Sequence, residues 1–309
     1  MKRVEISVLP EADVGLSRTE RLVKVLRGAR ALSNQIPRTS IVIVLGLGAV
    51  HMLALSTYLR FSSLLKRTVV YDVCDSWVLQ SKSRMSGSFG LVTPALLGVV
   101  MQATVGRLVL SSYISERDAK ADRFISRGSG IFVIGPAAPA ELHEALPLPV
   151  VVGPIQRLVV SADYEAFHND RGLGMLAEAW GIFHAEHPGV QLHLYGKGKP
   201  PEIPGATSLG WAKEMKDVYA GNTLVFIPNV SGSGVPNKLV DALTANRPIL
   251  VHSSIADVLD EHALIQSYDD SASLLNLLRS VCSQDFDFGE SKQIFPTSEL
   301  PSFLASGLR

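Results

Sequence analysis

The sequence predicts an α/β protein with two Rossmann-like domains. Short runs rich in Val, Ile and Leu alternate with longer segments of helical periodicity, a pattern typical of parallel strands that are buried on both faces. The alternation stops at a proline-rich stretch, residues 136–154, and then begins again. A chain of 309 residues, 47% hydrophobic and 19% charged, is long enough to build two such cores.

The first half carries the first alternation, and its expected strands are short and apolar. Ser115 is a suitable N-cap for the last helix, because its hydroxyl can accept a hydrogen bond from the first turn. The expected strands are 4–9, 40–45, 68–73, 108–114 and 131–134, and the expected helices are 18–33, 49–65, 94–106 and 116–124.

The most apolar window of the chain, residues 89–110, raises the question of a membrane span. Its proline, glycines and polar residues argue against a span, so we expect a buried helix, with peripheral membrane contact as the alternative. The N-terminus has too few apolar residues before Pro10 for a secretory signal and is predicted to be a strand.

The second half restarts the alternation after the linker. We expect an N-terminal domain at 1–145, a C-terminal domain at 146–290 and a final segment at 291–309. The expected strands are 158–162, 190–195, 207–209 and 224–227, and the expected helices are 173–187, 213–220 and 237–245. The unit is completed by three further segments, 249–252, 255–260 and 272–281.

Charge and cysteine content exclude some classes of function. Lys and Arg together number 29, as do Asp and Glu, so the net charge of +0 gives no global signal for nucleic-acid binding. Cys74 and Cys282 match no disulfide framework or zinc pattern, which favours a reducing, cytoplasmic setting. No cluster of His, Cys and carboxylates has metal-ligand spacing, so we expect neither a metal nor a cofactor.

The most informative motif is the glycine loop at residues 231–243, which follows an apolar run and opens a helix. Gly232 and Gly234 allow a ligand close to the backbone, and the first N–H groups of the helix suit a phosphate. Lys238 adds a positive charge, and Asp241 could accept hydrogen bonds from ribose hydroxyls. The alternative is a plain glycine turn with both charged side chains in solvent.

Four further motifs accompany this loop in order: Arg171-Gly172 before a helix, Tyr195-Gly-Lys-Gly198 after a strand, Leu209-Gly-Trp211 with Asp217-Val-Tyr219, and Arg247-Pro-Ile-Leu250. Over residues 157–252 the chain resembles the nucleotide-sugar domain of GT-B glycosyltransferases, in particular the large retaining family 4-like group. The resemblance implies two Rossmann-like domains that face each other across a cleft. It also implies that residues 291–309 pack back on the N-terminal domain.

The resemblance also implies roles in binding the donor. The diphosphate would meet the backbone of Gly232, Ser233 and Gly234 together with Arg171 and Lys238, the ribose would meet Asp241, and the base would meet Trp211 and Gly210. Arg171 as an ordinary surface cation and Trp211 as a core aromatic residue are the alternatives. The other donor-site candidates are Gly15, Arg18, Gly196, Lys197, Val235 and Asn237.

The acceptor side is defined less well by the sequence. The stretch Val70-Tyr-Asp-Val-Cys-Asp-Ser-Trp77 resembles a strand end that lines the acceptor side, and Asp75 is the candidate catalytic residue. The alternative is that Asp75 caps the turn after the strand. Where the family has an acidic residue that contacts the transferred sugar, this chain has Ser233.

The resemblance therefore predicts a glycosyltransferase. It would move a sugar from a UDP-sugar or GDP-sugar to an acceptor hydroxyl, with retention of configuration and without a metal. We expect it in the cytoplasm, with peripheral contact at the inner face of the membrane as an alternative. A degenerate nucleotide- or sugar-binding protein and a nucleotide-sugar epimerase on the same fold are the competing hypotheses.

Overall fold

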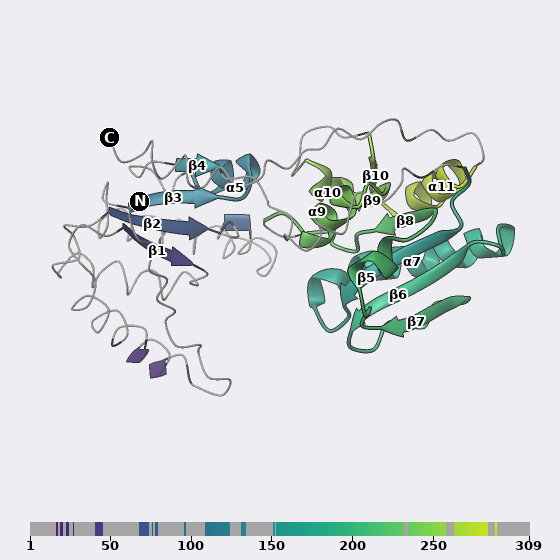
Figure 1. Cartoon of the computed structure of the whole chain (residues 1–309), viewed down its shortest axis with the longest axis horizontal. Coiled ribbons are helices and arrows are strands. Elements are labelled where there is room, and N and C mark those ends of the chain that lie inside the picture. The colour runs from purple at the N-terminus through teal and green to yellow at the C-terminus, as the bar shows by residue number, and fades with distance from the viewer. Residues whose placement is uncertain are drawn as a thin grey trace. The chain divides into compact units, whose positions relative to one another are not determined.

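The computed structural model divides the chain into two compact units, Met1–Ile134 and Gly135–Arg309 (Figure 1). The predicted domain boundary, residues 145–146, lies outside the described residues. The structure describes residues 41–45, 68–73, 109–123, 131–133, 153–231, 234–257 and 263–283, and single positions 17, 19, 20, 23, 24, 27, 76, 78, 79, 96, 151 and 288.

The first unit contains a parallel sheet whose strands follow their order in the sequence. It consists of β1 (Ile41–Leu45), β2 (Thr68–Val73), β3 (Val109–Tyr113) and β4 (Ile131–Val133). The sequence predicted each of these strands to within one residue at either end. The predicted strand 4–9 and helix 49–65 lie outside the described residues, and of the predicted helix 94–106 only residue 96 is described, as helical.

Helix α5 (Glu116–Ala121) follows β3, and Ser115 caps it as predicted, with the Asp118 amide donating to the Ser115 hydroxyl over 3.1 Å. The helix ends three residues earlier than the predicted residue 124. Asp122 has left helical geometry, and its carboxylate accepts hydrogen bonds from the chain after β2. Near the N-terminus, Ser17 and Glu20 form a capping box, which supports the predicted helix start at residue 18.

The second unit contains a six-stranded parallel sheet in the order β10-β9-β8-β5-β6-β7. Counted from β5, this is the strand order of a doubly wound Rossmann fold. Its strands are β5 (Arg157–Asp163), β6 (Gln191–Lys197), β7 (Ala206–Gly210), β8 (Thr223–Phe226), β9 (Ile249–His252) and β10 (Ile265–Tyr268). The sequence analysis missed β10, a four-residue strand that contains two polar residues.

Five helices of this unit are described: α7 (Phe167–Glu186), α8 (Met215–Tyr219), α9 (Asn237–Thr244), α10 (Ser253–Ala256) and α11 (Ser271–Val281). Helix α7 begins six residues before the predicted residue 173, so it includes Gly172, which the prediction had placed just before the helix. Because crossovers between parallel strands are right-handed, α7 and α9 cover opposite faces of the sheet.

The core of this unit lies between α7 and the sheet. Leu173, Leu176, Trp180 and Phe183 lie at helical spacing on the inner face of α7, and all are buried. The Trp180 indole donates to the Pro204 carbonyl over 3.1 Å, so its one polar atom is satisfied. Helix α11 packs beside α7, where Arg279 Nε donates to the Glu186 carboxylate over 2.8 Å.

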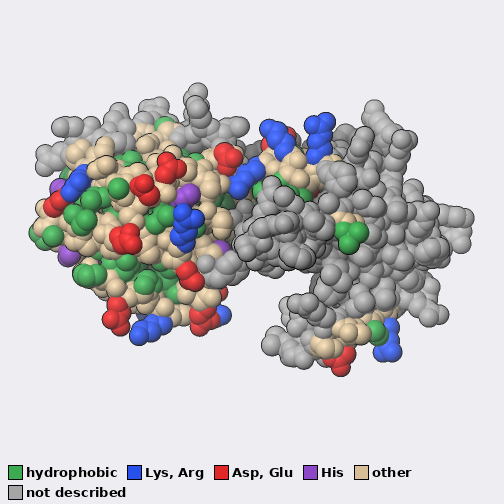
Figure 2. Space-filling view, turned by 180° about the vertical axis from the view of Figure 1, so that it is seen from behind, with side chains coloured by type: hydrophobic (Ala, Val, Ile, Leu, Met, Phe, Trp, Pro, Cys, Tyr) green, Lys and Arg blue, Asp and Glu red, His purple; other side chains and the backbone are tan. Residues whose placement is uncertain are grey.

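On the face of the second unit that Figure 2 shows, acidic and basic side chains are interspersed, without a large field of one sign. This agrees with the net charge of +0 of the whole chain. Among the described residues, none of the helices combines the length and the apolar character needed to cross a membrane.

Candidate functional site

The centre of the six-stranded sheet contains a topological switch point between β5 and β8. These strands pair with each other, yet the chain leaves β5 toward β6 and leaves β8 toward β9. The two connections therefore run in opposite directions, and open α/β sheets generally bind their ligands at such a point, outside the carboxyl ends of the strands. The predicted diphosphate residues all come from the segments that follow these two strands.

Gly172 brings the start of α7 against the end of β8. A Cβ atom at this position would lie 1.9 Å from the carbonyl oxygen of Pro228, closer than any side chain tolerates. Arg171 precedes this glycine, so its backbone lies at the same junction. Its side chain is exposed and has no ion-pair or hydrogen-bond partner among the described residues.

The glycine loop leads from β8 into α9. Gly234 is buried with φ at 72°, a left-handed conformation that favours glycine. Pro236 occupies the N-cap without a side-chain hydrogen bond to the helix, so no side chain at the cap competes for the first amides of α9. Val235 is buried, whereas Asn237 is exposed at the first position of the helix, and Gly232 and Ser233 lie outside the described residues.

Lys238 connects the two sides of the switch point. Its Nζ donates to Oδ1 of Asn229, just after β8, over 3.4 Å. Burial lowers the pKa of Lys238 to about 8, and the carboxylate of Asp163, the last residue of β5, acts in the opposite direction. The ammonium group is therefore half-buried between the ends of β5 and β8, which suits it to meet an anion there.

Asp241 lies three residues after Lys238, and the two therefore share one face of α9. Its side chain is half-buried, and burial raises the pKa of Asp241 to about 6. Burial also raises the pKa of the neighbouring Tyr219, with a further contribution from the charge of Asp241. Asp241 has no ion-pair partner among the described residues, and such a half-buried carboxylate can accept hydrogen bonds from ligand hydroxyls.

The carboxyl end of β6 packs tightly against β5. Gly196 has φ at 132°, and a Cβ there would lie 1.8 Å from the carbonyl oxygen of Ala162. Lys197 pairs with Glu165 at 3.4 Å, and its carbonyl accepts the Tyr164 amide over 2.9 Å. These contacts hold the chain that leaves β5 against the end of β6.

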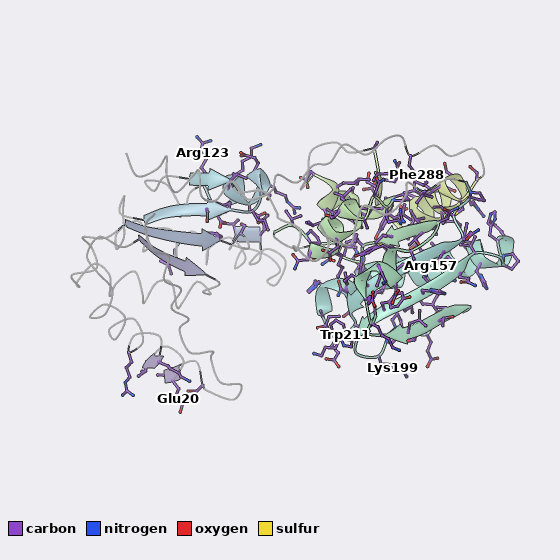
Figure 3. All side chains as sticks on the ribbon, in the orientation of Figure 1. Glu20, Arg123, Arg157, Lys199, Trp211 and Phe288 are labelled. Carbon is purple, nitrogen blue, oxygen red and sulfur yellow. The ribbon has the colours of Figure 1, made fainter. Side chains whose placement is uncertain are left out.

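Trp211 follows the carboxyl end of β7, at the edge of the sheet (Figure 3). It is 77% exposed, so the alternative that it is a core aromatic residue is wrong. Gly210 before it has φ at 64°, and a Cβ atom at this position would have no neighbouring atom within 4 Å. The indole therefore offers an open stacking face. It lies at the carboxyl ends of the strands, as the switch point does.

Several predicted residues cannot be placed in this way. Gly15, Arg18 and the candidate catalytic residue Asp75 lie outside the described residues. Conversely, sequence reasoning missed Asp163 and Asn229, which both act on Lys238. The sequence could have indicated these two residues through their position alone, because each follows the carboxyl end of a predicted strand.

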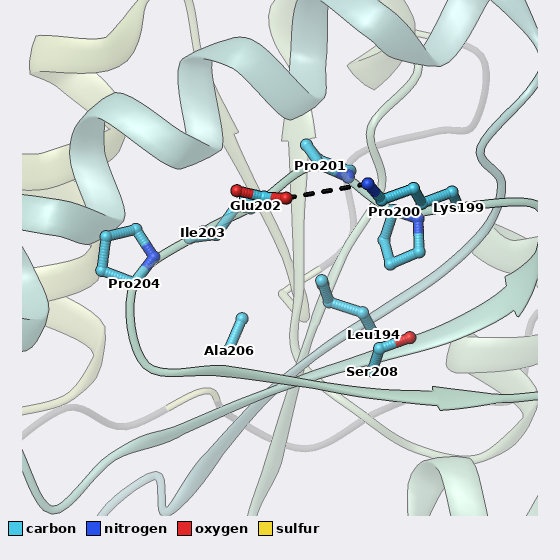
Figure 4. A pocket seen from close by; sticks show the side chains of 9 residues that line it. All are labelled: Leu194, Lys199, Pro200, Pro201, Glu202, Ile203, Pro204, Ala206 and Ser208. Carbon is cyan, nitrogen blue, oxygen red and sulfur yellow. Dashed lines mark ion pairs between the residues drawn. The ribbon is translucent and has the colours of Figure 1, made fainter.

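A separate pocket of about 640 Å³ lies on the second unit between β6, β7 and the connection that joins them (Figure 4). This connection, residues 198–205, has no helix, which leaves space over the sheet. Lys199 and Glu202 form an ion pair of 3.7 Å there. The lining residues are Leu194, Lys199, Pro200, Pro201, Glu202, Ile203, Pro204, Ala206 and Ser208, so the predicted donor residues do not take part in it.

Residues 156–284, less than half of the chain, match the family described as Glycosyl transferases group 1. No curated protein matches the chain significantly in sequence.

Solved structures match this chain over most of its length. TarM is 12% identical with a TM-score of 0.59, over 84% of this chain and 51% of TarM. HepE from Anabaena, in complex with UDP, is 15% identical with a TM-score of 0.56, over 83% of this chain and 71% of HepE.

A third match is α,α-trehalose 6-phosphate synthase from Burkholderia multivorans. It is 12% identical with a TM-score of 0.61, over 87% of this chain and 70% of the synthase. The chain thus spans about half the length of TarM and about 70% of the other two. Residues 156–284 are therefore similar to the glycosyl transferases group 1 family, in a chain whose two units share the fold of GT-B glycosyltransferases.

Proposed function

We propose that the protein transfers a sugar from a nucleoside-diphosphate sugar, preferably a UDP-sugar, to an acceptor hydroxyl with retention of configuration. The observation that carries this proposal is the switch point itself, where Lys238 and the start of α9 follow β8 and Arg171 follows β5. The preference for UDP rests on similarity of fold to HepE, which was solved with that nucleotide.

In such a transfer the main task of the protein is to stabilise the departing diphosphate. The bond between the anomeric carbon and the phosphate oxygen breaks, and a bond from that carbon to the acceptor oxygen forms. The diphosphate leaves with the acceptor proton or passes it to water. Lys238, Arg171 and the first amides of α9 would offset the charge that develops on the leaving group, which is commonly the largest electrostatic contribution to such a reaction.

The remaining donor contacts come from other segments that follow the carboxyl ends of the strands. Asp241 would accept hydrogen bonds from the ribose, and the exposed indole of Trp211 would stack on the base or pack beside it. Because two side-chain cations are available for the diphosphate, we propose that transfer needs no metal ion.

The test is release of nucleoside diphosphate from individual UDP- and GDP-sugars, with and without a chelator, together with binding of UDP. Lys238→Met and Arg171→Ala should each weaken UDP binding roughly 10- to 100-fold, because a hydrogen bond to a charged group contributes about 1.5–3 kcal/mol. Lys199→Met is the matched control, since this lysine is exposed, pairs with Glu202 and lies outside the switch point.

Unchanged UDP affinity in both site variants would remove the diphosphate assignment. Tight UDP binding without turnover of any donor would instead favour a binding protein, which the serine at position 233 makes a specific alternative. Loss of turnover on adding the chelator would contradict the metal-free mechanism.

A further inference from the structure

The short helix α10 carries a serine whose hydroxyl reaches the segment that leads into the glycine loop. The Ser254 hydroxyl donates to the carbonyl oxygen of Val230 over 2.7 Å. Val230 is buried and lies in the connection from β8 to α9, directly before the glycine loop, which begins at Ser231. Among the described residues no other group donates to this carbonyl. The serine therefore satisfies an acceptor that would otherwise be costly to bury.

His252, the last residue of β9, fixes the start of α10 and with it the serine. Its Nε2 lies 3.1 Å from the carbonyl oxygen of Asp269, which can only accept, so Nε2 carries a proton. Its Nδ1 accepts the backbone N–H of Ser254 over 3.1 Å and lies 2.8 Å from the Ser254 hydroxyl oxygen. The ring also meets Tyr268 edge to face, with 5.6 Å between the ring centroids. The end of β10 therefore holds the histidine, and the histidine holds Ser254.

The hydrogen bond to Val230 constrains both of its neighbours in the chain. The Val230 carbonyl shares one planar peptide unit with the N–H of Ser231, so a partner that holds this carbonyl orients the peptide that opens the glycine loop. On the other side, Oδ1 of Asn229 accepts the hydrogen bond of Lys238 Nζ over 3.4 Å. The Ser254 contact therefore lies between the residue that supports Lys238 and the loop itself.

We propose that Ser254, oriented by His252, is a positioning residue of the donor site. It holds Val230 and through it the segment that supports Lys238 and leads into the glycine loop. This inference rests on the proposed function, in which that lysine and the start of α9 bind the donor diphosphate. Ser254 acts on the donor through these groups, as a support that fixes them from behind.

The test compares two variants of Ser254 with wild type in the full chain. Ser254→Ala removes the hydroxyl, whereas Ser254→Thr keeps it, and the exposed position leaves room for the added methyl group. The matched control is Ser253→Ala, because this neighbouring serine on the same helix directs its hydroxyl to the Asp269 carboxylate rather than to Val230.

We expect Ser254→Ala to raise the Kd for UDP about 3- to 10-fold, the size of effect that the loss of one neutral hydrogen bond produces. Ser254→Thr and Ser253→Ala should bind UDP within twofold of wild type. Hydrogen exchange of the amides of residues 229–231 should become at least threefold faster in Ser254→Ala alone, while the amides of α7 keep their wild-type rates.

A double-mutant cycle tests whether the serine acts through Lys238. In the Lys238→Met background, Ser254→Ala should raise the Kd for UDP by a smaller factor than in wild type, because one of the groups that it positions is already absent. A serine that only stabilised the fold would weaken UDP binding by the same factor in both backgrounds, and that result would overturn the positioning role.

Unchanged UDP affinity in Ser254→Ala would also overturn the proposal, as would a loss that Ser254→Thr does not recover. The exchange measurement needs no ligand. A wild-type protein that bound no UDP would count against the proposed function, and the exchange rates of residues 229–231 in Ser254→Ala would still test the hold on Val230. Unchanged rates there would show that Ser254 does not hold this segment.

Discussion

Lys238 and Asp241 show how one helix face can set the pH range of a binding site. Both side chains are half-buried, and burial moves both pKa values toward neutrality, lowering that of Lys238 to about 8 and raising that of Asp241 to about 6. Burial disfavours the charged form in each case, so the shifts have opposite signs for a base and an acid. The two residues are therefore charged at the same time mainly between pH values of about 6 and about 8.

This pair predicts how UDP affinity depends on pH. The binding form of Lys238 is protonated, so affinity should be full below about 8 and should fall as pH rises through that value. The binding form of Asp241 is ionised, so affinity should also fall as pH drops through about 6. Titration calorimetry of UDP between these limits and one pH unit beyond each should give a maximum near neutrality.

Two variants check which residue causes the alkaline side of that profile. Asp163→Asn removes a negative charge that supports protonated Lys238, so the alkaline limb should move to lower pH. Lys238→Met should remove the limb. A limb that stays in place in both variants would assign it to another group.

The residue scale also shows what the sequence could not reveal. The glycine loop predicted Lys238 and Asp241, because both follow it on one helix. Asp163 lies 75 positions earlier in the sequence, and only the pairing of β5 with β8 brings it near the lysine. Local patterns identify residues of one segment, whereas the electrostatic partner came from a long-range contact.

At the scale of elements, the junction between α7 and β8 depends on Gly172. The sequence analysis predicted that α7 starts at residue 173, after this glycine, yet the helix includes it. The carbonyl of Pro228 occupies the space in which any side chain would lie. A tertiary contact therefore overrides the local preference, which is why the strands of this unit were predicted more accurately than the start of this helix.

Gly172→Ala should therefore destabilise the protein by about 1–3 kcal/mol, as overpacking in a core does, and should weaken UDP binding by displacing Arg171. Gly174→Ala is the matched control, because the same helix leaves open space around its Cβ. That change should be neutral or stabilise the protein by up to about 1 kcal/mol. Urea unfolding and UDP titration measure both effects, and equal stability of the two variants would contradict the close-packing argument.

On the scale of the whole molecule, the order of motifs along the chain predicted the fold better than any single motif did. Alternating strands and helices predicted both sheets, and the strand order of the second unit puts its topological switch point at β5 and β8. The strand β10 was missed because its four residues carry no clear apolar alternation. Its place in the sheet comes from pairing with β9, a contact that local sequence does not encode.

The same topology predicts where UDP should act on the full chain. Binding should slow hydrogen exchange most in residues 163–172 and 228–241, because these follow the two strands at the switch point. Residues 109–123 of the first unit and α11 of the second should change less, since neither contributes a predicted donor contact. Exchange can be measured by mass spectrometry with UDP at about 100 times its Kd. At that concentration the site is nearly fully occupied, and binding stabilises the folded protein by about 2.7 kcal/mol. If the slowing were confined to Met1–Ile134, the donor site would belong to the first unit, and the assignments of Arg171, Lys238 and Asp241 would be wrong together.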